Sequence, residues 1–316
     1  MVYQVLALLL LAAAAGYLLH NTLENMRGRG IKSGFDFLLQ PAGFSIGESV
    51  VPFDSSESYL KAYAVGLSNT LRVAVVGIVA ATVLGTLVGI GRLSRNTLVR
   101  ALCGAYVEST RNVPLLLQLF MWYFALTEFL PPIEEALRPL PGFFFSKNGL
   151  QFPVPWWVPG EGFVFEVPEK TDISVVGGGA VTPEYLTVLV GLSVYTAGYI
   201  AEVVRAGIQA VPFGQHEAAA SLGLTRWQAL RLVQLPQALR VIIPPLTSQY
   251  LNLTKNSSLA VAVGYPDVLS IAATSLNQTG RAIECIAIVM ACYLTLSLLT
   301  SALMGIYNRR ARLKER

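Results

Sequence analysis

Six apolar stretches, each about long enough to cross a lipid bilayer, dominate this sequence. A membrane-spanning helix needs about 20 mainly apolar residues. Of the 316 residues, 53% are hydrophobic and 13% are charged, whereas about a quarter of the residues of a soluble domain are charged. The sequence therefore predicts an all-α, polytopic membrane protein with six transmembrane helices. The candidate spans are residues 5–19, 65–90, 114–130, 187–208, 241–263 and 283–307.

The first stretch has two interpretations. Its small residues at 12–15 could serve as the cleavage site of a signal peptide. The four residues before the stretch contain no Lys or Arg, although a signal peptide normally has a positive charge there. A retained transmembrane helix is the favoured interpretation.

The distribution of basic residues predicts which side of the membrane each loop faces. Residues 92–113, 205–240 and 307–316 contain thirteen Lys and Arg against three acidic residues. The segments 20–67, 131–184 and 264–284 contain eight basic and fourteen acidic residues. Because loops rich in Lys and Arg remain in the cytoplasm, the first group and the C-terminus are predicted to be cytoplasmic. The basic residues Arg27, Arg29 and Lys32 fall on the outer side and oppose this assignment.

The predicted organisation has three parts. Residues 1–64 form an N-terminal transmembrane helix and a periplasmic segment, residues 65–309 form the transmembrane domain, and residues 310–316 form a basic cytoplasmic tail. The domain contains a periplasmic insertion at 131–183 and a cytoplasmic loop at 212–236. The insertion has nine prolines, which favours irregular loop with short strands and with aromatic residues near the membrane interface.

The cytoplasmic loop has the local chemistry of two short helices joined by a turn. The alanines after Glu217 favour a helix, and Gly223 can adopt the left-handed conformation that ends one. Thr225 and Gln228 fit a capping box that opens a second helix, and Pro236 is predicted to stop it. The small alanine side chains would let another protein approach closely. A simple amphipathic connector is the alternative interpretation.

This loop resembles the EAA loop of ATP-binding-cassette (ABC) importer permeases, in which it docks into a groove of the ATPase subunit. Val233 stands where that family usually has isoleucine. The residues that carry the resemblance, and the predicted coupling role, are Glu217, Ala218, Ala219, Gly223, Leu235 and Pro236.

The resemblance extends from residue 66 to residue 309. The segments 66–71, 106–114, 195–202 and 253–259 are similar to the polar amino-acid branch of these permeases. The segments 33–37, 264–267 and 276–280 are most similar to the first permease of general L-amino-acid uptake systems. The resemblance implies a bacterial inner-membrane permease subunit that moves L-amino acids, polar, acidic or of broad range.

By the same resemblance, the subunit would work in a heteromeric complex. The implied partners are a sibling permease, a dimer of ATP-binding subunits, a periplasmic amino-acid-binding protein, the L-amino-acid substrate and membrane lipid, with no nucleic acid. ATP and Mg²⁺ would bind to the partner ATPase, and this chain would have no cofactor and no enzymatic activity of its own. The sequence contains no GxxxxGK[ST] phosphate-binding loop, which agrees with that division.

Lys255 stands out as a strongly charged residue well inside an apolar span. An intramembrane lysine is costly unless it faces a cavity or a partner, so Lys255 is a candidate for the substrate path. Polar neighbours surround it, which favours a broken helix lining a cavity. The alternative is that Lys255 extends its ammonium group to the outer headgroups. The other candidates for the path are Asn252, Asn256, Ser257, Gln118, Tyr195 and Tyr199, although aromatic residues at helical spacing are usually packing residues.

Two pairs of opposite charges lie three residues apart near the inner membrane boundary. Glu202 with Arg205, and Glu108 with Arg111, are predicted to be local ion pairs rather than substrate ligands. The alternative function is a self-sufficient secondary transporter or channel, which would need an intramembrane carboxylate as a proton or sodium site. Only Glu202 comes near that role.

Metal and enzyme sites are disfavoured. The three cysteines lie in apolar stretches without metal-ligand spacing, and the two histidines are far apart.

Overall fold

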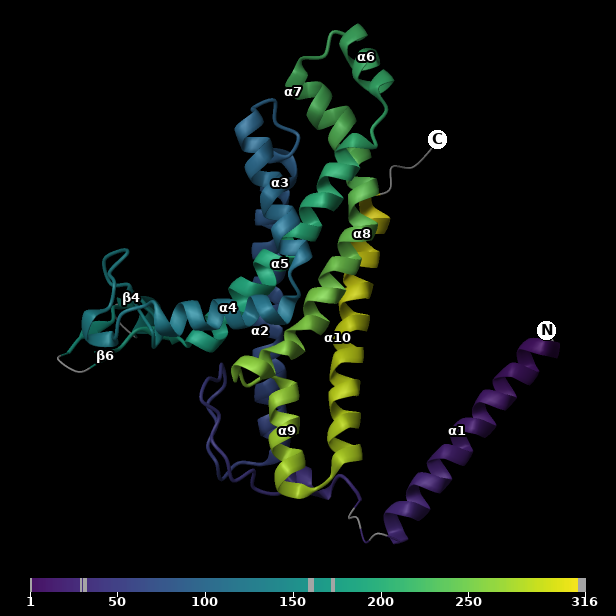
Figure 1. Ribbon diagram of the computed structural model, residues 1–316, viewed down its shortest axis with the longest axis vertical. Coiled ribbons are helices and arrows are strands. Elements are labelled where there is room, and N and C mark those ends of the chain that lie inside the picture. Colours follow the sequence, from purple (N-terminus) through teal and green to yellow (C-terminus); the bar gives the residue numbers. More distant parts are fainter. Residues whose placement is uncertain (1, 29, 31–32, 159–161, 172–173, 312–316) are drawn as a thin grey trace.

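The computed structural model describes residues 2–28, 30, 33–158, 162–171 and 174–311, and these are mostly helical. Figure 1 shows the arrangement. The long helices are α1 (Val2–Gly28), α2 (Tyr59–Gly91), α5 (Pro183–Gln209), α8 (Leu235–Asn256) and α10 (Ala282–Ala311). The shorter ones are α3 (Thr97–Asn112), α4 (Leu115–Glu128), α6 (Phe213–Ser221), α7 (Arg226–Ala229) and α9 (Val268–Thr279). The 3₁₀ turns are η1 (Asp36–Leu39), η2 (Ile133–Glu135) and η4 (Ser257–Val263), and η3 (Leu230–Gln234) is a π-helix.

Helices α2 and α5 form the centre of the core, and glycines on α2 let them approach closely. A Cβ atom on Gly85 would lie 2.7 Å from the Cβ of Ile200, and one on Gly89 would lie 2.7 Å from the carbonyl oxygen of Ala201. Side chains from α4 and α8, among them Leu119 and Leu253, complete the same buried cluster. The small residues therefore bring two long helices into backbone contact, as in packed membrane helices.

Four helices are long and apolar enough to cross a membrane, namely α1, α2, α5 and α10, in the part of the chain that the structure describes. A fifth span arises if the segment from Arg226 to Val263 and the bent continuation Val268–Thr279 are counted together. The third predicted span, 114–130, forms a helix of only 14 residues, α4. At 1.5 Å per residue α4 is about 21 Å long, so it is shorter than the roughly 30 Å hydrocarbon core.

The segment 92–113, assigned from its charges to a cytoplasmic loop, contains a helix of 16 residues, α3. The side chain of Asn96 caps it by accepting from the backbone N–H groups of Leu98 and Val99. An Asn at this position satisfies N–H groups that have no partner within the helix.

The insertion after α4 forms short antiparallel strands. Strands β1 (Phe144–Ser146), β2 (Gly149–Phe152) and β7 (Gly179–Val181) make a three-stranded sheet in the order β1-β2-β7. The hairpins β3 (Val154–Val158) with β4 (Gly162–Glu166), and β5 (Glu169–Lys170) with β6 (Val175–Val176), accompany it. These strands project sideways from the helices at the end of α4 (Figure 1).

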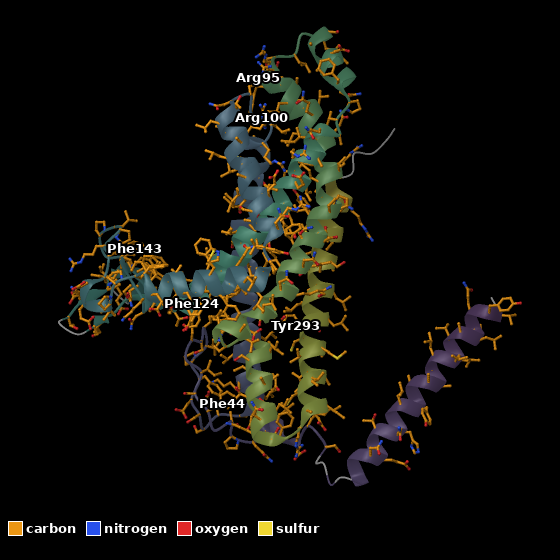
Figure 2. The ribbon with its side chains drawn as sticks, in the orientation of Figure 1. Phe44, Arg95, Arg100, Phe124, Phe143 and Tyr293 are labelled. Atoms are coloured by element: carbon orange, nitrogen blue, oxygen red, sulfur yellow. The ribbon has the colours of Figure 1, made fainter. Side chains whose placement is uncertain are left out.

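The two ends of the helical bundle carry different elements of the chain. We call the end that carries α6 and α7 the coupling end, and the opposite end, with the α9–α10 turn, the far end. The C-terminal end of α10 lies toward the coupling end, and helix α1 stands apart from the bundle (Figure 1). Arg95 and Arg100 also lie at the coupling end, whereas Phe44 lies near the far end (Figure 2).

Candidate functional site

The turn that ends α6 has the geometry that its glycine permits. Gly223 has φ +72°, its N–H donates to the carbonyl of Ala220 at 2.9 Å, and the next N–H, of Leu224, donates to Ala219 at 3.1 Å. These two bonds form a Schellman motif, which ends a helix with a left-handed residue. The prediction that Gly223 ends the first helix is confirmed.

The second helix of the predicted pair opens as expected but does not end as expected. Thr225 and Gln228 form the capping box, with the hydroxyl of Thr225 accepting from the N–H of Gln228 and the Gln228 amide oxygen accepting from the N–H of Thr225. The prediction that Pro236 stops the helix is wrong, because α7 continues through the π-helix η3 into α8. The N–H of Leu235 bonds the carbonyl of Leu230, five residues back. This wider turn accommodates the ring of Pro236, which would otherwise clash with the carbonyl four residues earlier.

Large apolar side chains are exposed on this segment, which we call the coupling segment (residues 212–236). Phe213, Leu222 and Trp227 are 74%, 80% and 67% exposed. Ala219 and Ala229 are buried, and the Gln237 amide donates to that of Gln215 at 3.2 Å. The alanines are therefore packed positions of the two short helices, while the large apolar side chains are exposed to solvent. Glu217 and Ala218 are exposed on the same segment.

Lys255 lies where the α-helix ends and a 3₁₀ helix begins. It is in the last turn of α8, and η4 follows from Ser257 to the left-handed Gly264. Lys255 and Asn252 are exposed and Asn256 is half-buried. No hydrogen bond or ion pair joins the Lys255 side chain to another residue in the described part of the chain. Ser257 is buried, and its hydroxyl donates to the carbonyl of Thr254. The helix changes from α to 3₁₀ beside Lys255, whereas the bend in this span lies between Val263 and Val268; a cavity at Lys255 stays a prediction.

Three of the other candidates for the substrate path, Gln118, Tyr195 and Tyr199, contact other residues. Gln118 is buried, and its amide nitrogen donates to the carbonyls of Thr110 at 2.7 Å and Val113 at 2.9 Å. Both amide hydrogens therefore serve to close the end of α3, and the place of Gln118 on the substrate path stays a prediction. The hydroxyls of Tyr195 and Tyr199 lie 3.2 Å apart on one face of α5.

The predicted ion pairs differ in outcome. Glu202 pairs with Arg205 at 2.7 Å and also with Arg92 at the end of α2, so it joins two helices. Glu108 and Arg111 form no ion pair among the described residues, which corrects the prediction. The Arg111 guanidinium instead lies 5.2 Å from the ring centre of Tyr199.

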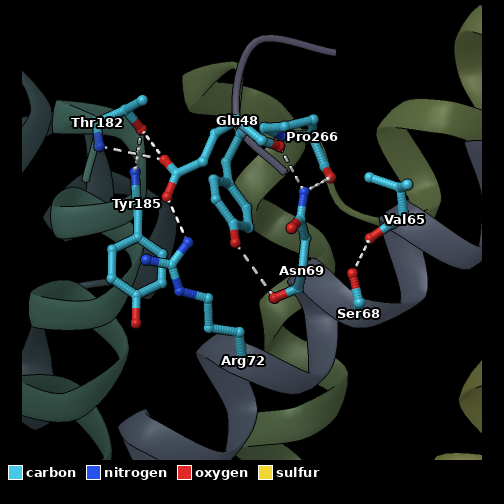
Figure 3. Close-up of polar contacts among 9 residues, drawn as sticks. Glu48, Val65, Ser68, Asn69, Arg72, Thr182, Tyr185 and Pro266 are labelled. Carbon is cyan, nitrogen blue, oxygen red and sulfur yellow. Dashed lines mark hydrogen bonds and ion pairs between the residues drawn. The ribbon is translucent and has the colours of Figure 1, made fainter. Parts of the chain in front are cut away.

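A network around Glu48, at the far end, was missed by the sequence reasoning. Glu48 is buried between α2 and α5, where its carboxylate pairs with Arg72 at 2.6 Å and accepts from the N–H of Thr182 at 3.2 Å and from the Thr182 hydroxyl (Figure 3). Its carbonyl accepts from the amide of Asn69 at 2.8 Å. Arg72 lies inside the predicted span 65–90, so the rule that singles out Lys255 also applied to Arg72.

The described residues contain no group of three His, Cys, Asp or Glu side chains that could hold a metal ion. The three cysteines are free thiols.

With this geometry in place, comparison with known proteins identifies the class. Residues 75–313 match the family described as "binding-protein-dependent transport system inner membrane component". The chain belongs to this family of inner-membrane permeases of ABC transport systems.

Individual relatives match nearly the whole chain. The putative amino-acid ABC transporter permease protein YhdX of Escherichia coli strain K12 is 43% identical over 99% of this chain and 94% of its own length. The general L-amino acid transport system permease protein AapQ of Rhizobium johnstonii is 41% identical over 99% of this chain and 92% of its own. A chain from a crystal structure of an amino acid ABC transporter with histidines has a TM-score of 0.59 and 26% identity, covering 80% of this chain and 95% of that one.

Proposed function

We propose that this chain is the permease subunit of an importer that moves L-amino acids, polar, acidic or of broad range, across the bacterial inner membrane. Family membership supports the permease assignment, and the names of YhdX and AapQ support the substrate class. The energy would come from a dimer of separate subunits that bind ATP and Mg²⁺. A sibling permease and a periplasmic amino-acid-binding protein would complete the complex.

The observation that carries the proposal is the coupling segment. It presents Phe213, Leu222 and Trp227 outward at one end of the bundle, on two short helices held by a Schellman turn and a capping box. A rigid element with exposed aromatic side chains suits a protein interface, because such side chains lose little conformational freedom on binding. We assign the ATPase to this surface.

The coupling end would face the cytoplasm. Arg95 and Arg100 lie at this end (Figure 2), and basic residues flanking membrane helices favour the cytoplasmic side. Helix α10 ends toward the same end (Figure 1), so the C-terminus would also be cytoplasmic. The far end, with Glu48 and the α9–α10 turn, would then face the periplasm.

A secondary transporter is disfavoured by the contacts of Glu202. A carboxylate that carries protons or sodium must release its partners during each cycle. Glu202 is in contact with both Arg92 and Arg205, as expected for a structural ion pair between helices.

The test uses two tryptophans of similar exposure, Trp227 in the coupling segment at 67% and Trp157 in β3 at 59%. The tagged complex, expressed from its own operon, is purified in mild detergent, and the co-purifying ATPase and the ATP-dependent uptake of labelled L-glutamate, L-glutamine and L-arginine are measured. We expect Trp227→Ser to lose most of the ATPase and most of the uptake, and Trp157→Ser to retain both. Full ATPase binding and uptake in Trp227→Ser would contradict the docking assignment, and absence of uptake of every amino acid in the unmodified complex would contradict the substrate class.

A further inference from the structure

The ion pair between Arg72 and Glu48 is more enclosed than a surface pair. Nη1 of Arg72 lies 2.6 Å from Oε1 of Glu48, and the two side chains are 26% and 8% exposed. The guanidinium carbon of Arg72 is 4.0 Å from the ring centre of Tyr185. An arginine side chain has five N–H donors, so donors remain beyond the one that Glu48 accepts.

Both charges line one cavity. It is an open depression on the surface of the bundle, has a volume of about 720 Å³ and lies between the loop that carries Glu48, helix α2 and the strands of the insertion. Ser49 and Ser68 add polar groups, and its other walls are mainly aliphatic side chains such as Val75 and Val154. Sites for small molecules have this character, with volumes of roughly 300–1,000 Å³, apolar walls and a few convergent polar groups.

The position of the loop does not depend on the Glu48 carboxylate alone. The amide of Asn69 donates to the backbone carbonyl of Glu48 at 2.8 Å and to that of Pro266 at 2.9 Å (Figure 3). The hydroxyl of Tyr265 donates to the carbonyl of Asn69 at 3.2 Å. The charged side chains are therefore placed in the cavity by contacts of neutral groups.

We propose that Arg72 and Glu48 together bind the α-carboxylate and α-ammonium groups of a free L-amino acid in this cavity. The inference rests on the proposed amino-acid import and deepens it. The remaining N–H donors of Arg72 bind the α-carboxylate, and the Glu48 carboxylate, which has lone pairs beyond those it uses, accepts from the α-ammonium. The amino-acid side chain lies along the aliphatic wall.

The charge balance of the site selects zwitterions. One fixed positive and one fixed negative charge match the two α-groups of an amino acid, whereas a simple anion or amine leaves one of them facing a ligand without an opposite charge. Because the two residues contact only groups that all amino acids share, the site accepts different side chains.

The test measures protection of a cysteine in the cavity wall. Cys103, Cys285 and Cys292 are replaced by Ser, Ser49→Cys is introduced, and the assembled transporter is reconstituted in nanodiscs without the binding protein. The rate of labelling by a charged maleimide is measured with and without millimolar L-alanine, L-lactate or ethylamine. Ser55→Cys, on the exposed part of the same loop, is the matched control. We expect L-alanine to slow labelling at position 49 at least threefold, with lactate and ethylamine without effect and with position 55 unchanged.

Two variants separate ligand binding from folding. Arg72→Gln should abolish protection by L-alanine. Glu48→Gln keeps a hydrogen-bond acceptor toward Arg72 and leaves the cavity with one positive charge, so protection should pass from L-alanine to L-lactate. An effect of Glu48 that was merely structural would not reverse the ligand preference.

Three results would overturn the inference, namely no protection by L-alanine, protection that survives Arg72→Gln, and no gain of lactate protection in Glu48→Gln. Uptake of labelled L-alanine by the same complex, with the binding protein added, distinguishes a failure of this binding site from a failure of the proposed import function. Uptake without protection would overturn this site alone, whereas absence of uptake of every amino acid would count against the proposed function.

Discussion

Arg281 and Asp36 form a two-pronged ion pair although 245 positions separate them in the chain. Nη2 of Arg281 lies 2.9 Å from Oδ2 of Asp36, and Nη1 contacts both Oδ1 of Asp36 and the carbonyl of Gly34. The N–H of Gly34 donates to Glu284 at 2.6 Å. The hydrogen bond to Asp36 raises the pKa of the Arg281 guanidinium. These contacts fasten the segment after α1 to the α9–α10 turn.

Replacing Arg281 should loosen this attachment. The Arg281 side chain is 10% exposed whereas Asp36 is 64% exposed, so solvent screens part of the ion pair. The bond from Arg281 to the carbonyl of the half-buried Gly34 is therefore expected to contribute more. We expect Arg281→Gln to lower the free energy of unfolding by about 1–2 kcal/mol and Asp36→Asn by less than about 1 kcal/mol. Lys147→Gln, on an exposed turn, is the control. Thermal unfolding of the detergent-solubilised protein measures the order, and equal midpoints for Arg281→Gln and Lys147→Gln would contradict it.

A side chain on Gly85 should separate α2 from α5. A Cβ there would lie 2.7 Å from Ile200 and 2.8 Å from the carbonyl of Ala197, and a backbone atom cannot move aside as a side chain can. We expect Gly85→Val to destabilise the protein by about 1–3 kcal/mol or more.

Gly104 on α3 is the matched control, because a Cβ there would meet no atom within 4 Å. Gly104→Val should shift the midpoint of thermal unfolding much less than Gly85→Val. Similar shifts for the two variants would mean that the close contact of α2 with α5 does not determine stability.

The left-handed turn at Gly223 should be required for coupling because of its backbone angle and not because of lack of space. A Cβ at Gly223 would meet no atom within 4 Å, and the same is true of Gly43, which has a similar φ of +70°. A left-handed conformation costs a residue other than glycine roughly 1–2 kcal/mol. We expect Gly223→Val to abolish ATP-dependent uptake while the protein remains inserted, and Gly43→Val, at the other end of the molecule, to retain most of it. Uptake that falls equally in both variants would indicate general destabilisation.

Features that depend on neighbouring residues in the chain could be predicted from the sequence. The Schellman turn at Gly223 and the capping box of Thr225 and Gln228 each involve groups within a few positions of one another. The end of the second helix was mispredicted, because the π-helix before Pro236 accommodates the proline ring. No residue pattern in the sequence indicated that π-helix.

Features that depend on contacts between distant segments were missed. Arg72 lies in a span whose average hydropathy hides a single charge, and its partner Glu48 lies 24 positions away in a loop. Gln118 looked available for a substrate, yet it closes the end of α3. Arg111 contacts the ring of Tyr199 on another helix in place of Glu108 on its own. In each case the contact depends on how separate segments of the chain pack against one another, which hydropathy does not encode.

Lys255 provides the last prediction, which concerns its place in the substrate path. Its ammonium group is exposed at the junction of α8 and η4, where a change of helical geometry leaves backbone groups available. A lysine there could bind the carboxylate of an amino acid and would favour neutral or acidic side chains over basic ones. We expect Lys255→Ala to lose most uptake of labelled glutamate and glutamine, and Lys255→Arg, which keeps the positive charge, to lose less. Lys255→Met preserves most of the length but removes the charge, so it should behave like Lys255→Ala. Normal uptake in Lys255→Met would assign Lys255 to an anchoring role at the headgroups, because only its apolar stem would then be needed.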